Sequence, residues 1–129
     1  MKYLLDVNAL IAFGHNNHEF HDRVALWTER ISPEVFTCSI TELGFVRILS
    51  QVPQYDQTVA QVRTLLLMLK SSTTLPLQFL ADAHDISRLP AWVSGPNQTT
   101  DGHLAELARA HGALLATLDT GIPGAYLIR

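Results

Sequence analysis

The sequence contains a single cysteine, Cys38, among its 129 residues. One cysteine excludes an internal disulfide, and this fits a reducing compartment, so we expect a cytoplasmic protein. The sequence also lacks the run of about 18 apolar residues that a membrane helix needs. Asp6 and Asn8 interrupt the apolar stretch near the N-terminus, so no signal peptide is predicted there. We therefore expect no association with a membrane.

The sequence has little excess charge of either sign. Nine Lys and Arg residues face 12 Asp and Glu residues, which gives a net charge of −3, so the composition does not indicate a strongly basic nucleic-acid binder. If four of the 12 acids held divalent cations, the remaining acids would nearly balance the basic residues. Hydrophobic residues make up 47% of the chain, enough for the core of one domain of this length.

Three short apolar segments are each followed by an acidic residue. The segments are typical of strands buried on both faces of a parallel sheet, and they lie at residues 3–5, 35–38 and 113–117. The acids that follow them are Asp6, Glu42 and Asp119. Taken singly, each acid also fits a structural role, as the N-cap of a helix or as a partner of the helix dipole.

Amphipathic periodicity predicts helices between these strands. The expected helices lie at residues 7–13, 17–31, about 39–52, 56–70 and about 99–111, and further strands at 75–80 and 126–128. In the third of these helices, Leu43, Val46 and Leu49 are expected to face the core. Strands that alternate with helices imply right-handed crossovers, so we predict an α/β fold with a mostly parallel sheet.

The acids are expected to meet at one edge of this sheet, because ligands of open α/β folds bind outside the carboxyl ends of the strands. Asp101 opens the helix that leads into the strand before Asp119, so it joins Asp6 and Glu42 in the predicted cluster. Carboxylates this close do not all stay ionised without cations. Oxygen ligands favour Mg²⁺ or Mn²⁺, and such a site suits hydrolysis of a phosphodiester.

Other polar residues near the acids are candidates for supporting roles. Asn8, Thr117 and Thr120 are candidates for hydrogen bonds that orient the acids. Arg47 and Arg109 are candidates for contacts with phosphate.

Histidines recur every three residues at positions 15, 18 and 21. They fit a zinc site only in part, because no cysteine or fourth ligand follows at metal-site spacing. We therefore favour a solvated or partner-facing row for His15, His18 and His21. For His103, close to the predicted acids, we favour a structural role over acid–base chemistry.

Four sequence blocks, in order along the chain, point to a known family. They are LLDVNALI at 4–11, TELGFVR at 41–47, TDGHLAELA at 100–108 and GALLATLD at 112–119. Together they resemble the PIN-domain family, and specifically the VapC-type toxins of type II toxin–antitoxin pairs.

The resemblance implies a three-layer α/β/α sandwich with a central, mostly parallel sheet, formed by one PIN domain over residues 1–129. It implies that Asp6, Glu42, Asp101 and Asp119 bind Mg²⁺ or Mn²⁺ and catalyse cleavage of RNA, of the transfer or ribosomal RNA class. The partners that it implies are this RNA, a cognate antitoxin and a second copy of the chain in a homodimer.

Two other functions are compatible with the sequence. A PIN-fold nuclease that processes RNA or cuts single-stranded DNA is one, and the small size of the chain favours the toxin over it. A non-catalytic PIN-like binding module is the other, and the full set of four acids argues against it. A receiver domain also places acids at strand ends, but it needs a lysine near the last strand, where this sequence has none.

Overall fold

A five-stranded sheet forms the centre of the structure, a computed structural model that describes residues 1–129. Its strands are β1 (Lys2–Leu5), β2 (Glu34–Thr37), β3 (Leu77–Phe79), β4 (Leu114–Thr117) and β5 (Tyr126–Leu127). They lie in the order β3-β2-β1-β4-β5, and every neighbouring pair is parallel. The predicted parallel sheet is therefore confirmed, with the segment at 75–80 forming an edge strand.

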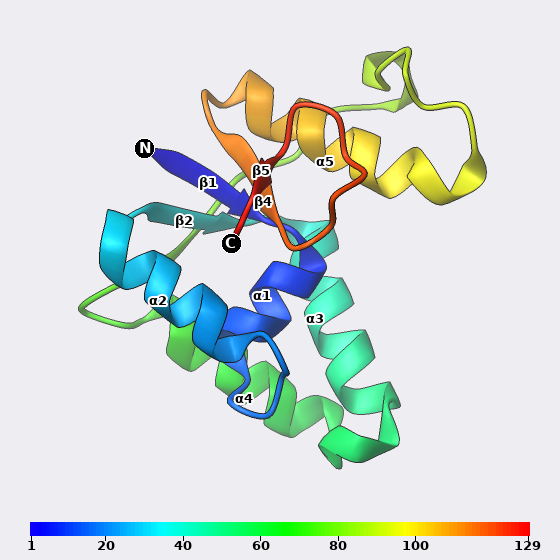
Figure 1. The fold of residues 1–129 in the computed structure, drawn as a ribbon. Helices are drawn as coiled ribbons and strands as arrows, with labels where there is room; N and C mark the ends of the chain where they lie inside the picture. Colours follow the sequence, from blue (N-terminus) through cyan, green and yellow to red (C-terminus); the bar gives the residue numbers. More distant parts are fainter.

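Five helices connect and cover the strands (Figure 1). They are α1 (Val7–Gly14), α2 (His21–Ile31), α3 (Ser39–Gln51), α4 (Val59–Lys70) and α5 (Thr99–Ala110), with short 3₁₀ helices η1 (Pro53–Tyr55), η2 (Ile86–Arg88) and η3 (Pro96–Gln98). No helix combines the length and the apolar character needed to cross a bilayer.

Two helices begin later than periodicity predicted. The helix expected from residue 17 starts at His21, because the imidazoles of His15 and His18 accept hydrogen bonds from backbone N–H groups two residues further on and so stabilise turns. The helix expected from residue 56 starts at Val59, because Thr58 forms a capping box that fixes its N-terminus. The spacing of apolar residues does not predict these local hydrogen bonds, so it placed both helix starts too early.

The helices form two layers, one on each face of the sheet. Alternate residues of β1 point to opposite faces: Tyr3 and Leu5 pack with residues of α1, α2, α3 and α4, whereas Leu4 packs with residues of α5. Figure 1 shows the same arrangement, with α5 on one side of the sheet and the other four helices on the opposite side. The predicted three-layer α/β/α sandwich is confirmed.

The apolar side of α3 is not entirely buried. Leu49 is fully buried and Val46 is half-buried, but Leu43 keeps 67% of its surface exposed, so the prediction that Leu43 faces the core is wrong. Periodicity cannot distinguish a residue of the core from an apolar residue on an uncovered face of the same helix.

The order of the strands reverses direction next to β1. The chain runs from β1 outward to β2 and β3, and then returns to the other side of β1 to form β4 and β5. Such a switch point opens a crevice at the carboxyl ends of the two strands, where ligands of open α/β folds bind. The residues that follow β1 and β4 therefore border the place where a site is expected.

Candidate active site

Asp6 follows β1 and closes the base of this crevice. Its Oδ1 accepts a hydrogen bond from the backbone N–H of Val7 at 2.7 Å, and its Oδ2 accepts one from the hydroxyl of Thr117 at 2.8 Å. Burial raises the pKa of Asp6, whereas the hydrogen bonds from Thr117 and Val7 lower it and the charge of Asp119 raises it again. Asp6 thus caps α1, and its carboxylate also interacts with the negative charge of Asp119.

Asp101 and Asp119 lie close enough to Asp6 for their charges to interact. Asp101 is in the first turn of α5, where burial raises its pKa and the charges of Asp6 and Asp119 raise it further. Asp119 is exposed after β4, where its Oδ1 accepts a hydrogen bond from the backbone N–H of Gly121 at 3.1 Å. The fold therefore brings together three acids from different parts of the sequence.

The position of Asp101 depends on a close contact at its neighbour, Gly102. This glycine is buried, and a Cβ atom on it would lie 2.3 Å from Cγ2 of Val93. Only a residue without a side chain lets the first turn of α5 pack this closely against the preceding loop. That packing holds the helix turn that carries Asp101 against the loop.

Glu42, the fourth predicted acid, has different partners. It lies in the first turn of α3, where its Oε2 accepts hydrogen bonds from the hydroxyl of Thr37 and, at 2.7 Å, from the ammonium of Lys70. Glu42 is not among the charges that raise the pKa of Asp6 and Asp101, because those charges belong to the other aspartates. Glu42 faces a positive charge, and the aspartates face one another.

The donors at this edge have the chemistry of a site for a hard divalent cation. Asp6, Asp101 and Asp119 offer only carboxylate oxygens, which suit Mg²⁺ or Mn²⁺. No three histidine, cysteine, aspartate or glutamate side chains are already gathered as a metal-binding group. The donor chemistry of the three aspartates fits such a cation, whereas the carboxylate of Glu42 is paired with Lys70.

Two buried threonines at strand ends orient the acids. Thr117, the last residue of β4, donates to Asp6 and also accepts a hydrogen bond from the backbone N–H of Asp119 at 3.0 Å. Thr37, the last residue of β2, donates to Glu42 in the same way. Sequence reasoning selected Thr117 but missed Thr37, although its place at the end of a strand, shortly before an acid, was a signal that could have found it.

The other predicted supporting residues lie at varied distances from the acids. Asn8, in the first turn of α1, and Thr120, next to Asp119, are both exposed. Arg47 is exposed on α3. Arg109 lies in the last turn of α5, about 12 Å along the helix from its first turn at about 1.5 Å per residue. There it forms hydrogen bonds of 2.9 and 2.6 Å with Glu106.

The histidines outside the acidic edge have structural partners. Nδ1 of His21 contacts the carbonyl oxygen of Ala12 at 2.7 Å, and His15 and His18 use Nδ1 in the turns described above. Only His21 belongs to α2, so the three do not form a row on one helix. Nε2 of His103 lies at hydrogen-bond distance from Oδ2 of Asp82, in line with a structural role.

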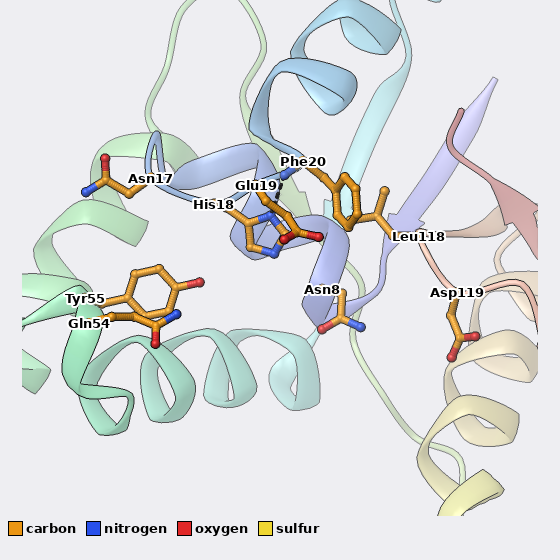
Figure 2. A pocket seen from close by; sticks show the side chains of 9 residues that line it. All are labelled: Asn8, Asn17, His18, Glu19, Phe20, Gln54, Tyr55, Leu118 and Asp119. Atoms are coloured by element: carbon orange, nitrogen blue, oxygen red, sulfur yellow. Dashed lines mark hydrogen bonds between the residues drawn. The ribbon is translucent and has the colours of Figure 1, made fainter.

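A cavity of about 590 Å³ opens beside Asp119 (Figure 2). Its walls come from α1, from the turn before α2, from η1 and from the residues after β4. The lining residues are Asn8, Asn17, His18, Glu19, Phe20, Gln54, Tyr55, Leu118 and Asp119. Of these, sequence reasoning had selected only Asn8, His18 and Asp119, because the others meet only through the fold.

Comparison with known proteins agrees with this architecture. The PIN domain family matches residues 3–126 of the chain. Ribonuclease VapC44 of Mycobacterium tuberculosis is 34% identical over 137 aligned positions, which cover 97% of this chain and 94% of the relative. Ribonuclease VapC38 of the same species is 36% identical over 125 positions, which cover 92% of this chain and 86% of the relative.

Solved structures show the same fold at lower sequence identity. VapBC2 from Rickettsia felis, bound to a DNA fragment from its promoter, contains a chain that matches with a TM-score of 0.64 and 20% identity, covering 98% of this chain and 97% of that one. VapC20 of Mycobacterium tuberculosis, a toxin that cleaves the sarcin–ricin loop, matches with a TM-score of 0.63 and 13% identity, covering 93% and 92%. The chain therefore belongs to the PIN domain family and, within it, to the VapC group.

Proposed function

We propose that this protein is the toxin of a toxin–antitoxin pair and that it acts in the cytoplasm as an endoribonuclease dependent on Mg²⁺ or Mn²⁺. The proposal rests on one observation above the others. Three aspartates that are far apart in the sequence, Asp6, Asp101 and Asp119, interact through their charges at the switch point of a PIN-domain sheet. Relatives that cover nearly the whole chain are named ribonucleases, which supports the same activity.

The proposed chemistry assigns a role to each group at the edge. Asp6, Asp101 and Asp119 would hold the cation, with Thr117 and the N–H of Val7 keeping the Asp6 carboxylate in one orientation. Glu42 would join them on leaving Lys70, and Asn8 and Thr120 would orient the acids or the substrate. A bound Mg²⁺ or Mn²⁺ would supply an activated water and neutralise charge on the scissile phosphate. Arg47 and Arg109 are proposed contacts to more distant phosphates.

The proposed partners are a second copy of the chain and a cognate antitoxin. The α3–α4 side exposes several large apolar residues, with 67% of Leu43, 58% of Leu67 and 64% of Met68 accessible to solvent. Apolar surface of this kind marks interfaces between proteins. Chains of similar fold have been solved as VapBC assemblies from Rickettsia felis and Salmonella typhimurium, which supports an antitoxin as partner. We propose that residues 1–129 work as one PIN domain in such an assembly.

The experiment is expression of the chain from a tightly repressed promoter, with sequencing of new RNA 5′ ends in the cell. We expect growth arrest and a small number of sharp new ends. The matched control is Asp101→Asn, which keeps the size of the side chain but removes a metal-binding charge, and it should give neither. Arrest by both proteins, or new ends that persist in the variant, would contradict the proposal.

A further inference from the structure

The cavity beside Asp119 is a candidate binding site that the acidic edge does not explain. It extends from Asp119 past Asn8 to Gln54 and Tyr55 of η1. In the view of Figure 2, His18 lies between the rings of Tyr55 and Phe20, and Asn8 lies between His18 and Asp119. Its volume, about 590 Å³, lies within the range of about 300–1,000 Å³ that is usual for small-molecule sites.

The lining has the wrong charge for a phosphate and the right chemistry for an uncharged ring. No lysine or arginine is among the nine lining residues, and Glu19 and Asp119 are acidic. The amides of Asn8, Asn17 and Gln54 each offer both donors and an acceptor. A planar, neutral group with hydrogen-bonding edges therefore fits the cavity better than an anion does.

His18 provides a hydrogen-bond donor of fixed orientation. Its Nδ1 accepts the backbone N–H of Phe20 at 3.0 Å, so in the neutral imidazole the proton is on Nε2. Burial lowers the pKa of His18, although the charge of Glu19 opposes the change, so the neutral form is favoured near pH 7. His18 thus presents an N–H group to the cavity.

Two aromatic rings are fixed by contacts outside the cavity. The guanidinium carbon of Arg23 lies 4.4 Å from the centroid of the Phe20 ring. The rings of His15 and Tyr55 meet edge to face, with their centroids 4.8 Å apart. Rigid aromatic side chains beside amide groups are what single-stranded RNA recognition uses, with bases stacked on rings and read along their edges.

We propose that this cavity binds one unpaired nucleobase of the RNA, next to the phosphate that is cut at Asp119. Tyr55 stacks on the base, and His18, Gln54 and Asn8 bond to its edge. The inference rests on the proposed ribonuclease function and adds to it the reading of one base. Stacking on a ring strengthens the binding of any base, whereas the bonds to its edge set which base is preferred. Loss of the stacking contact should therefore weaken cleavage of all the RNAs by about 5- to 150-fold, the range for a single base on an aromatic ring.

The test compares cleavage of short single-stranded RNAs with randomised sequence, in Mn²⁺, by the wild-type chain and by variants of the cavity. We expect the wild type to favour one base next to the cut. Gln54→Ala should weaken that preference and still cut. Tyr55→Ala should cut all sequences less well, whereas Tyr55→Phe, which keeps the ring, should cut more like the wild type. Gln54 is exposed, so its variant checks the result if Tyr55→Ala does not fold.

A second measurement separates failure of the inference from failure of the proposed function. Amide chemical shifts of the labelled protein are followed, with chelator present to prevent cleavage, while a single-stranded 2′-deoxy oligonucleotide and, separately, the four free nucleosides are added. Shifts at 17–20 and 54–55 support the inference even if the wild type does not cut RNA, an outcome that would overturn only the proposed function. Cleavage without base preference, an unchanged preference in Gln54→Ala together with undiminished cleavage by Tyr55→Ala, or absence of shifts at these residues would overturn the inference.

Discussion

The hydroxyl of Thr117 joins two acids of the proposed site, and its removal is the sharpest test of how the site is built. Thr117 is fully buried, donates to Asp6 and accepts from the N–H of Asp119. Thr117→Val keeps the shape of the side chain and removes both hydrogen bonds. The buried carboxylate of Asp6, only 7% exposed, then loses one of its two donors.

The expected loss of stability follows from these two bonds. A hydrogen bond to a charged group contributes about 1.5–3 kcal/mol and a neutral one about 0.5–1.5 kcal/mol, so Thr117→Val should lower the free energy of unfolding by about 2–4 kcal/mol. For a chain of this length, that corresponds to a fall in Tm of about 10 °C. Thr37→Val, the matched control on β2, should cost less, about 1 kcal/mol, because half-buried Glu42 keeps its ion pair with Lys70.

The effect of Thr117→Val on stability should depend on pH through the Asp6 carboxylate. Burial raises the pKa of Asp6 above its ordinary value of 3.8, so ionising Asp6 costs the folded state stability as the pH rises through the folded pKa. The Thr117 hydrogen bond lowers that pKa, so its loss makes the cost larger. The difference between Thr117→Val and wild type should therefore be greatest near neutral pH and shrink in acid.

The assay is urea unfolding of the two proteins, followed by circular dichroism across this pH range, with Thr117→Ser as the variant that restores the hydroxyl. A Thr117→Val protein as stable as wild type at neutral pH would refute the reasoning. So would a destabilisation that does not change with pH, because that would place the effect in packing and not in the Asp6 carboxylate.

Three further predictions concern the same edge. Lys70→Met should change the unfolding free energy by less than about 1 kcal/mol, because the ion pair with Glu42 is partly exposed. The variant should also bind Mn²⁺ more tightly in calorimetry, because Glu42 no longer pairs with a positive charge. Weaker binding would show that Lys70 assists the site. Gly102→Ala should cost about 1–3 kcal/mol in thermal unfolding, because the new methyl group would overlap Val93; an unchanged Tm would mean that α5 has room to move. Mn²⁺ affinity should fall as the pH is lowered, since the pKa of Asp101 is raised and protons compete with the metal; an affinity independent of pH would exclude Asp101 as a ligand.

The fold could be predicted because its strands are unusually uniform. Segments such as Tyr3–Leu5 are apolar at every position, which is typical of strands buried on both faces. The alternation with helices then leaves few topologies, and the carboxyl ends of the strands fall at one edge. Exposed apolar residues such as Leu43 were misplaced, because periodicity shows a face without showing what covers it.

The sequence predicted which aspartates and which threonine come together at the edge of the sheet, but not the partners of the other groups. Asp6 and Asp119 follow strands directly, so topology alone brings them together. The ion pair of Glu42 with Lys70 joins residues 28 positions apart and depends on how α4 packs, which no local pattern contains. The cavity was not predicted either. Phe20, Tyr55 and Asp119 belong to three separate connections between elements, and they line one cavity only in the folded chain.

Asp6, Asp101 and Asp119 are proposed to form a metal-dependent ribonuclease site. The most direct measurement is cleavage of a defined RNA by the purified chain, first with chelator and then with increasing Mn²⁺, beside Asp101→Asn. We expect no cleavage with chelator, cleavage that rises and saturates with Mn²⁺, and a loss in the variant beyond the roughly 10–100-fold caused by removing a supporting residue. Cleavage that persists with chelator, or an Asp101→Asn protein as active as wild type, would contradict this proposal.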